Sequence, residues 1–446
     1  MKSYVPNTIE ERMKMLDAVG ADVFEDLYAD IPEELRLKGP LALPGGMSES
    51  QVRRIFQGLA AKNRTELTVF RGAGAYSHYI PAAVPQLAMR SEFYTAYTPY
   101  QAEMSQGMLQ AIFEYQTLIC QLTGLDVSNA SVYDGATAAA EAMHMLCDAK
   151  RKRKVLYSAG LHPDVIATLK TYARFSKVEL VEIPLNENGV TDPAALAQYS
   201  QDAAGFLAAQ PNFFGCVEDI QALAEAVHAF GGLMAEYVYP HALGVLARPG
   251  DLGCDIAVGD GQPLGLPLAF GGPYVGFMAA TQKLARNLPG RIAGQTADAD
   301  GNRAYVLTLQ AREQHIRREK ASSNICSNQM LCAVMVSMYL ALMGPEGLKE
   351  AANQSMQKAH YLAEGISHIK GVRLKYPDTP FFNEFTVEYE KDASLVNALL
   401  KARGIMGGLR LNRMGFAGNG ALWCATEQNT RQELDEVLSV LEEVLA

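Results

Sequence analysis

The sequence lacks the cysteine and histidine spacings that indicate metal sites or disulfide frameworks. It has seven cysteines, an odd number, and no two of them are spaced as C-x-x-C. They are Cys120, Cys147, Cys216, Cys254, Cys326, Cys332 and Cys424. Scattered cysteines among apolar neighbours are typical of small core residues in a reducing compartment. We therefore expect no metal site and a cytoplasmic location.

The sequence also lacks a membrane segment and an excess of positive charge. Residues 1–6 have no apolar core of the kind that a signal peptide needs. The longest apolar stretch, Leu331–Met343, is shorter than the roughly 20 residues that span a bilayer, so it predicts a buried helix. The formal net charge is -10. It argues against nucleic acid or an anionic membrane as a partner.

With 446 residues the chain is too long for one compact core, and its pattern changes twice. Residues 1–65 predict a helical arm, in which Thr8 opens a capping box and Ser48 begins a second helix. Residues 66–325 predict a large α/β domain, and residues 326–446 predict a smaller C-terminal α+β domain.

The large domain alternates helices with short apolar runs. One helix is expected over Gln101–Leu122 and another after Asp134. The apolar runs are Val155–Tyr157, Val178–Ile183, Phe206–Ala209, Leu233–Ala235, Ile256–Val258 and Val275–Ala279. Buried short strands that alternate with helices predict a doubly wound, mostly parallel sheet. In such sheets ligands bind beyond the carboxyl ends of the strands.

The C-terminal part predicts a mixture of helices and strands. Helices are expected near Leu331–Met343 and Glu346–Ile369, and strands near Phe382–Val387 and Leu422–Ala425. Thr430 opens a capping box for a last helix, which carries an apolar face.

The helix after Tyr133 opens with Asp134, Gly135, Ala136 and Thr137. Small residues leave backbone N–H groups open at a helix N-terminus, which suits a phosphate. The Asp134 carboxylate could instead cap the helix through the Thr137 N–H. A carboxylate and a phosphate repel each other in one anion hole, so we favour the cap.

Polar and aromatic side chains crowd the expected start of the first helix of the large domain. They are Tyr97, Thr98, Tyr100, Gln101 and Glu103. Pro99 suits the first helical position, which makes Thr98 the expected N-cap. Such a cluster can form a polar wall beside a ligand or only a well-capped helix with surface aromatics, and the residues leave both interpretations open.

Two further segments stand out. Gly259–Pro273 follows an expected strand and is rich in Gly and Pro, so its backbone can approach a ligand or partner closely, although a structural loop has the same composition. Arg312–Asn324 mixes both charge signs, which predicts a solvated helix face, with an anion-binding or interface role as the alternative. The chain has no G-x-S-x-G nucleophile motif.

Four of these stretches together resemble the P-protein of the glycine cleavage system. They are Thr98–Glu103, Ser131–Thr137, Gln210–Gly215 and Arg312–Lys320. The likeness covers nearly the full length and is closer to subunit 1 of the form made as two separate chains. It implies a fold-type-I pyridoxal-phosphate architecture in an α2β2 assembly with subunit 2. It also implies a reaction that decarboxylates glycine and transfers the aminomethyl group to the lipoyl arm of the H-protein.

The resemblance also implies three departures from a complete cofactor site. A lysine must hold the cofactor, and alignment of the family pattern on Gly271–Pro273 puts Gln262 at its position. The acid that pairs with the pyridine nitrogen falls near Ala235–Pro240, where Glu236 is the only acid, and Asp134 stands in the phosphate cup. The expected degenerate pocket consists of Asp134, Gly135, Thr137, Glu236 and Gln262.

The resemblance therefore predicts a subunit of glycine dehydrogenase (decarboxylating) that is inactive alone and binds no cofactor covalently. The partner subunit carries the pyridoxal phosphate. The residues expected to face a site shared by the two chains are Tyr97, Thr98, Tyr100, Gln101 and Glu103. One alternative is a self-sufficient pyridoxal-phosphate aminotransferase or lyase that uses Lys283 or Lys320, and another is a non-catalytic scaffold.

Overall fold

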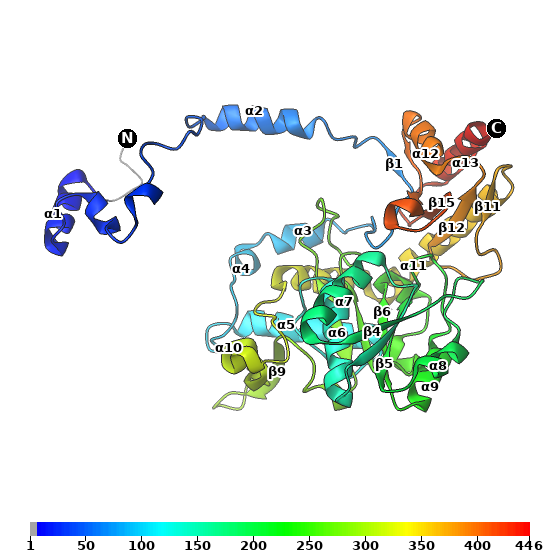
Figure 1. Cartoon of the computed structure of the whole chain (residues 1–446), viewed down its shortest axis with the longest axis horizontal. Coiled ribbons are helices and arrows are strands. Elements are labelled where there is room, and N and C mark those ends of the chain that lie inside the picture. The colour runs from blue at the N-terminus through cyan, green and yellow to red at the C-terminus, as the bar shows by residue number, and fades with distance from the viewer. Residues whose placement is uncertain (1–6) are drawn as a thin grey trace. The chain divides into compact units, whose positions relative to one another are not determined.

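The computed structural model describes residues 7–446, and the chain divides into two compact units between Thr65 and Glu66. The first unit contains α1 (Ile9–Val19), η1 (Phe24–Tyr28), η2 (Glu33–Leu35) and α2 (Glu49–Ala60) (Figure 1). Both α-helices begin with complete capping boxes, at Thr8 and at Ser48, as the sequence predicts. No side chain between residues 7 and 65 is buried, so this unit has no core of its own.

The second unit is built on a seven-stranded sheet (Figure 1). Its strands are β2 (Val127–Ser128), β3 (Lys154–Ser158), β4 (Glu179–Ile183), β5 (Ala203–Gln210), β6 (Leu233–Val238), β7 (Ile256–Asp260) and β8 (Gly276–Ala280). The order is β2-β8-β7-β6-β5-β3-β4. Strands β3 to β7 are parallel, and β8 pairs antiparallel with both of its neighbours, β7 and β2. The apolar runs of the sequence fall on these strands, which confirms the mostly parallel α/β fold.

Helices cover both faces of this sheet. They include α5 (Gln106–Thr123), α6 (Gly135–Lys150), α7 (Pro163–Ser176), α8 (Leu196–Tyr199) and α9 (Ile220–Ala229). The short helices α3 (Ala83–Ala88) and α4 (Ser91–Tyr94) precede them in the chain. Leu146 of α6 packs in the same core as Ala235, whereas Leu223 of α9 packs in the same core as Met234. Successive side chains of a strand point to opposite faces. The residues of β6 therefore divide between the α6 face and the α9 face, and this division decides where its polar residues point.

The long helix α11 (Met330–Ser367) is two helices separated by a break. Gly344 has φ 61 and ψ -178, and Pro345 follows it. Gly344 therefore lies in the left-handed region that favours glycine, and Pro345 cannot supply a backbone donor. The break confirms the two helices expected on either side of it. The first half packs with α5, β7 and β8, and Val336 and Tyr339 are buried there.

The C-terminal part forms a second sheet. Its strands are β11 (Val372–Leu374), β12 (Glu384–Tyr389), β14 (Leu409–Arg410) and β15 (Gly420–Cys424), in the antiparallel order β11-β12-β15-β14. The second half of α11, α12 (Ala393–Ala402) and α13 (Arg431–Leu445) share its core, which includes Trp423 and Val437. The capping box at Thr430 is present, as expected. Strand β1 (Thr68–Val69) pairs with β13 (Ile405–Met406), so the chain joins this domain directly after the first unit.

One expected helix start is wrong. Helix α5 begins at Gln106 after the N-cap Ser105, so Thr98 is not an N-cap and Pro99 is not in a helix. The Gln106 side chain donates to the Tyr305 carbonyl at 2.9 Å and accepts from the Tyr305 N–H at 2.9 Å. Tyr305 belongs to a hairpin of β9 (Ile292–Ala297) and β10 (Arg303–Thr308) that the sequence did not predict. This long-range contact fixes the first turn of α5 in place of the local cap.

Candidate functional site

A small pocket lies at the carboxyl ends of β5, β6 and β7, the edge at which parallel α/β sheets bind ligands. Residues just after each of these strands line it together with the segment 73–76, His162, and Glu384 of β12. Its volume is about 60 Å³. Pockets that bind small organic ligands usually measure roughly 300–1,000 Å³. This edge of the sheet is therefore where a ligand would bind in such a fold, but side chains of the chain itself almost fill it.

Gln262 lies beside this pocket and is committed to backbone contacts. Its side chain is 1% exposed, and its Oε1 accepts from the Tyr76 N–H at 3.0 Å. Its Nε2 donates to the Tyr76 carbonyl at 3.0 Å and to the Leu266 carbonyl at 2.8 Å. Both amide protons and the amide oxygen are thus used. Gln262 ties the segment around Tyr76 to the loop after β7, and its amide has no free group to offer a ligand.

The N-terminus of α6 is filled by two carboxylates. Asp134 accepts from the Thr137 N–H at 2.7 Å, which confirms the expected cap. Asp260 of β7 accepts from the Gly135 N–H at 2.9 Å and from the Gln262 N–H at 2.8 Å. Burial raises the pKa of Asp260 to about 6, with the Asp134 charge adding to the effect and the two N–H bonds opposing it. A phosphate at this helix end would have to displace or approach both carboxylates.

Glu236 points away from the helix α6. Its carboxyl group is fully buried and accepts from the Cys254 thiol at 3.2 Å. Cys254 belongs to the core on the α9 face of the sheet. Burial raises the pKa of Glu236 to about 8, so the group is mainly protonated at neutral pH. On the opposite face of β6, Tyr237 is the residue that approaches the start of α6 and lines the pocket.

These observations do not fit bound pyridoxal phosphate in this pocket. The lining residues, all within the described part of the chain, include no lysine, so an imine with the cofactor could not form there. The helix end suited to a phosphate holds Asp134 and Asp260, and the only acid of β6 faces the other side of the sheet. The pocket volume is also several-fold too small. The residues that line this pocket therefore do not fit the cofactor that the resemblance implies.

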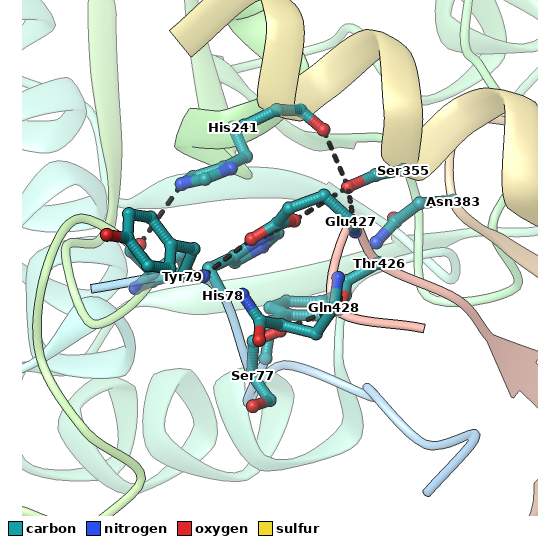
Figure 2. A network of polar contacts seen from close by, with 12 residues as sticks. Ser77, His78, Tyr79, His241, Ser355, Asn383, Thr426, Glu427 and Gln428 are labelled. Atoms are coloured by element: carbon teal, nitrogen blue, oxygen red, sulfur yellow. Dashed lines mark hydrogen bonds and ion pairs between the residues drawn. The ribbon is translucent and has the colours of Figure 1, made fainter. Parts of the chain in front are cut away.

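A buried polar network includes Tyr239, which lines the pocket, and Figure 2 shows the part of this network around Glu427. His78 Nδ1 lies 2.7 Å from Glu427 Oε2, and its Nε2 hydrogen-bonds to the Tyr239 hydroxyl. The His78 ring stacks on His241 with centroids 3.6 Å apart. Burial, and then the neighbouring His78, lower the pKa of His241 well below its ordinary value. Figure 2 shows Glu427 between His78 and Ser355, whose hydroxyl donates to Glu427 at 3.0 Å.

The same network connects three parts of the chain. Burial acts to raise the pKa of Glu427, but the bonds from His78 and the Tyr79 N–H lower it to about 2, so this carboxylate stays ionised. The Tyr76 hydroxyl donates to Glu384 at 2.6 Å, and the Tyr76 ring stacks on Tyr239 at 4.0 Å. The segment before α3, the turn after β6 and the C-terminal sheet are thereby held in one arrangement.

The segment Tyr97–Glu103 lies elsewhere, on the surface. Tyr97 is 86% exposed and Tyr100 is 49% exposed. Arg291 is buried, donates to the Tyr100 hydroxyl at 2.7 Å and lies over the Tyr100 ring at 5.0 Å from its centroid. The segment is thus irregular in backbone but anchored by Arg291. None of its five candidate residues lines the pocket after β5, β6 and β7.

The lysines of the alternative hypothesis also lie away from the pocket. Lys283 follows β8, and the neighbouring Thr281 N–H donates to the carbonyl of Asp255, just before β7. Lys283 is therefore at the amino edge of the parallel strands, opposite the pocket. Lys320 is exposed in η8 (Arg318–Lys320), within the segment Arg312–Asn324.

Several lining residues were not singled out from the sequence. They are Tyr76, His162, Tyr237, Tyr239, Asp260 and Glu384. The position of Asp260 at the end of an expected parallel strand was a usable signal. Tyr76 and Glu384, whose side chains form a hydrogen bond, are 308 positions apart in the sequence. No local sequence pattern could have predicted that they meet at this pocket.

Comparisons with solved structures first define the class. The chain has the fold of pyridoxal-phosphate enzymes of fold type I. It superposes on a sphingosine-1-phosphate lyase of Burkholderia pseudomallei with a TM-score of 0.67 at 13% identity, covering 93% of this chain and 94% of that one. The TM-score is 0.62 with a cysteine desulfurase of Thermococcus onnurineus at 15% identity, covering 90% of this chain and 99% of that one. At these identities the likeness concerns the fold alone.

Closer matches define the family. The model of the glycine cleavage system P-protein family matches residues 2–441. The probable glycine dehydrogenase (decarboxylating) subunit 1 of Moorella thermoacetica is 50% identical over 100% of both chains, and that of Desulfitobacterium hafniense is 48% identical over 99% of this chain and 100% of its own. A crystal structure of an inhibitor-bound glycine decarboxylase (P-protein) is 45% identical, with a TM-score of 0.92 over 100% of both chains. The chain belongs to the glycine cleavage system P-protein family, together with these subunit 1 proteins.

Proposed function

We propose that this chain is the cofactor-free subunit of a two-subunit glycine dehydrogenase (decarboxylating). Its partner, subunit 2, carries the pyridoxal phosphate, and the two form an α2β2 assembly. The assembly decarboxylates glycine and passes the aminomethyl group to the lipoyl arm of the H-protein. The observation that supports this proposal is the small pocket with no lysine among the described residues that line it. Beside it lies Gln262, which we assign to the position of the cofactor lysine and whose side-chain amide bonds only to backbone groups.

The names of the relatives support the proposed partner, because a subunit 1 implies a second chain. Because the pocket at the sheet edge does not fit the cofactor, we infer that this chain contributes to catalysis through a surface. The segment Tyr97–Glu103 offers such a surface, because aromatic and polar side chains are exposed there while Arg291 holds Tyr100 in place. We place this segment against the partner's site, where its hydroxyl and amide groups can orient glycine or exclude water.

The test is substitution of this segment in the reconstituted complex. We expect Tyr100→Phe and Gln101→Ala each to lower the kcat of glycine–bicarbonate exchange about tenfold or more, the size of effect that loss of one positioned polar group usually has. Gel filtration should show an unchanged complex. Unchanged exchange at saturating partner would refute the placement, and loss of assembly without loss of kcat would favour a pure scaffold.

A matched control is available in the C-terminal domain. Tyr361 accepts from Arg431 at 2.8 Å and lies under its guanidinium at 3.8 Å, as Tyr100 accepts from and lies under Arg291. The Tyr361 hydroxyl also donates to Asp435. Tyr361→Phe therefore removes a similar hydroxyl from a similar arginine contact. We expect it to leave exchange unchanged.

A further inference from the structure

A second concave site lies in the C-terminal domain. It is lined by residues of α12 (orange in Figure 1), by residues in and around β13 and β14, and by Arg71, just after β1. Its volume is about 240 Å³. Four of its lining residues are cations: Arg71, Lys401, Arg410 and Arg413. The other lining residues are polar or apolar, and no Asp or Glu is among them within the described part of the chain. A positive pocket is unexpected on a chain whose net charge is -10.

The arginines of this pocket are placed against one another. Arg71 is half-buried and is fixed by a hydrogen bond from its Nε to the Gly407 carbonyl at 2.8 Å. Burial lowers the pKa of Arg71, and the charges of Arg413 and Arg410 lower it further. Since like charges repel, this arrangement costs free energy that a bound anion would recover.

Other arginines of the same domain are neutralised by carboxylates. Arg373 contacts Glu388 at 2.6 Å, Arg403 contacts Glu443 at 2.9 Å, and Arg431 contacts Asp435 at 3.0 Å. By contrast, within residues 7–446 Arg410 and Arg413 make no ion pair. The domain thus pairs its ordinary surface arginines and leaves those that line the pocket without a counter-charge.

The pocket also contains a polar group without a partner. Asn397 on α12 donates through its Nδ2 to the Gly408 carbonyl at 2.8 Å, while its buried Oδ1 has no hydrogen-bond partner in the described chain. Buried polar atoms without a partner are uncommon, and they often mark a place where a ligand or water bonds.

We propose that this pocket binds a phosphate dianion, either free or as the phosphate monoester of a small molecule. The planar guanidinium groups of Arg410 and Arg413 suit the oxygens of a phosphate. The two charges of a dianion would offset part of the charge of the four lining cations. The site is separate from the pocket at the sheet edge and does not depend on the proposed function.

The test is calorimetric titration of the full-length chain with inorganic phosphate and with glycerol phosphate, with sodium chloride and acetate at equal ionic strength as references. We expect both phosphates to bind, and Arg410→Gln with Arg413→Gln to weaken them at least tenfold. The control, Arg373→Gln with Arg431→Gln, removes two paired arginines of the same domain and should leave binding unchanged. Tighter binding of the ester would assign the site to an ester, and tighter binding of inorganic phosphate would assign it to the free ion.

Thermal unfolding separates binding from folding. Without phosphate, the variant lacking Arg410 and Arg413 should melt at or above the temperature of the unchanged chain, because repulsion around Arg71 is relieved. With phosphate, only the unchanged chain and the control variant should gain stability. The proposal is overturned if phosphate stabilises the chain no more than chloride does, or if the control variant loses binding equally.

Discussion

Substitution of Gln262 by methionine tests whether this residue is a structural clamp. The side chain is 1% exposed and makes three hydrogen bonds, two with the backbone of Tyr76 and one with Leu266. Methionine has a similar length and volume, so it leaves little cavity, but it can form none of these bonds. At a net value of about 1 kcal/mol for each bond, Gln262→Met should destabilise this part of the chain by about 3 kcal/mol.

Hydrogen exchange measures this effect locally. The Tyr76 N–H donates to Gln262, so its exchange reports on the clamp. A loss of about 3 kcal/mol corresponds to roughly 100-fold faster exchange in the peptide that contains Tyr76. Gln221→Met is the matched control, because Gln221 is exposed and bonds only to Glu225 on the same helix. If exchange around Tyr76 is the same in both variants and in the unchanged chain, the clamp does not exist.

Three further predictions concern Glu236, Gln262 and Thr430. Glu236 keeps its proton in the folded chain up to about pH 8, against an ordinary value of 4.5, so its burial destabilises the fold increasingly as pH rises through that window. Glu236→Gln should therefore melt several degrees above the unchanged chain at pH 9 and close to it at pH 5, and an equal difference at both values would contradict this. Gln262→Lys should gain no pyridoxyl adduct when it is mixed with pyridoxal phosphate and reduced with borohydride, because Asp134 and Asp260 occupy the helix end where the phosphate would bind. An adduct on residue 262 in mass spectrometry would contradict this. Thr430→Ala should cost about 1 kcal/mol in thermal or urea unfolding through loss of the last capping box, and Thr430→Ser should not.

Much of the fold was accessible from local patterns. Buried strands such as Ile256–Asp260 are short apolar runs, and their alternation with helices defines the sheet. The caps at Thr8, Asp134 and Thr430 were also readable, because each links residues three apart. Patterns of this kind require only near neighbours in the sequence.

The structural features that the sequence did not predict correctly depend on contacts between residues far apart in the chain. Thr98 and Pro99 have the composition of a helix start, but Gln106 bonds to Tyr305, 199 positions away, and α5 begins there instead. The clamp at Gln262 joins residues 186 positions apart. The face of the sheet toward which Glu236 points depends on which alternate residues of β6 face α6. The sequence alone does not define this.

The central claim is that this chain is required for glycine cleavage but cannot carry it out alone. Glycine–bicarbonate exchange should be measured for this chain, for subunit 2 and for their mixture, each with pyridoxal phosphate and lipoylated H-protein. The account predicts no exchange by this chain alone and full exchange only in the mixture. Exchange by this chain alone at the rate of the mixture, or no gain when it is added to subunit 2, would contradict it.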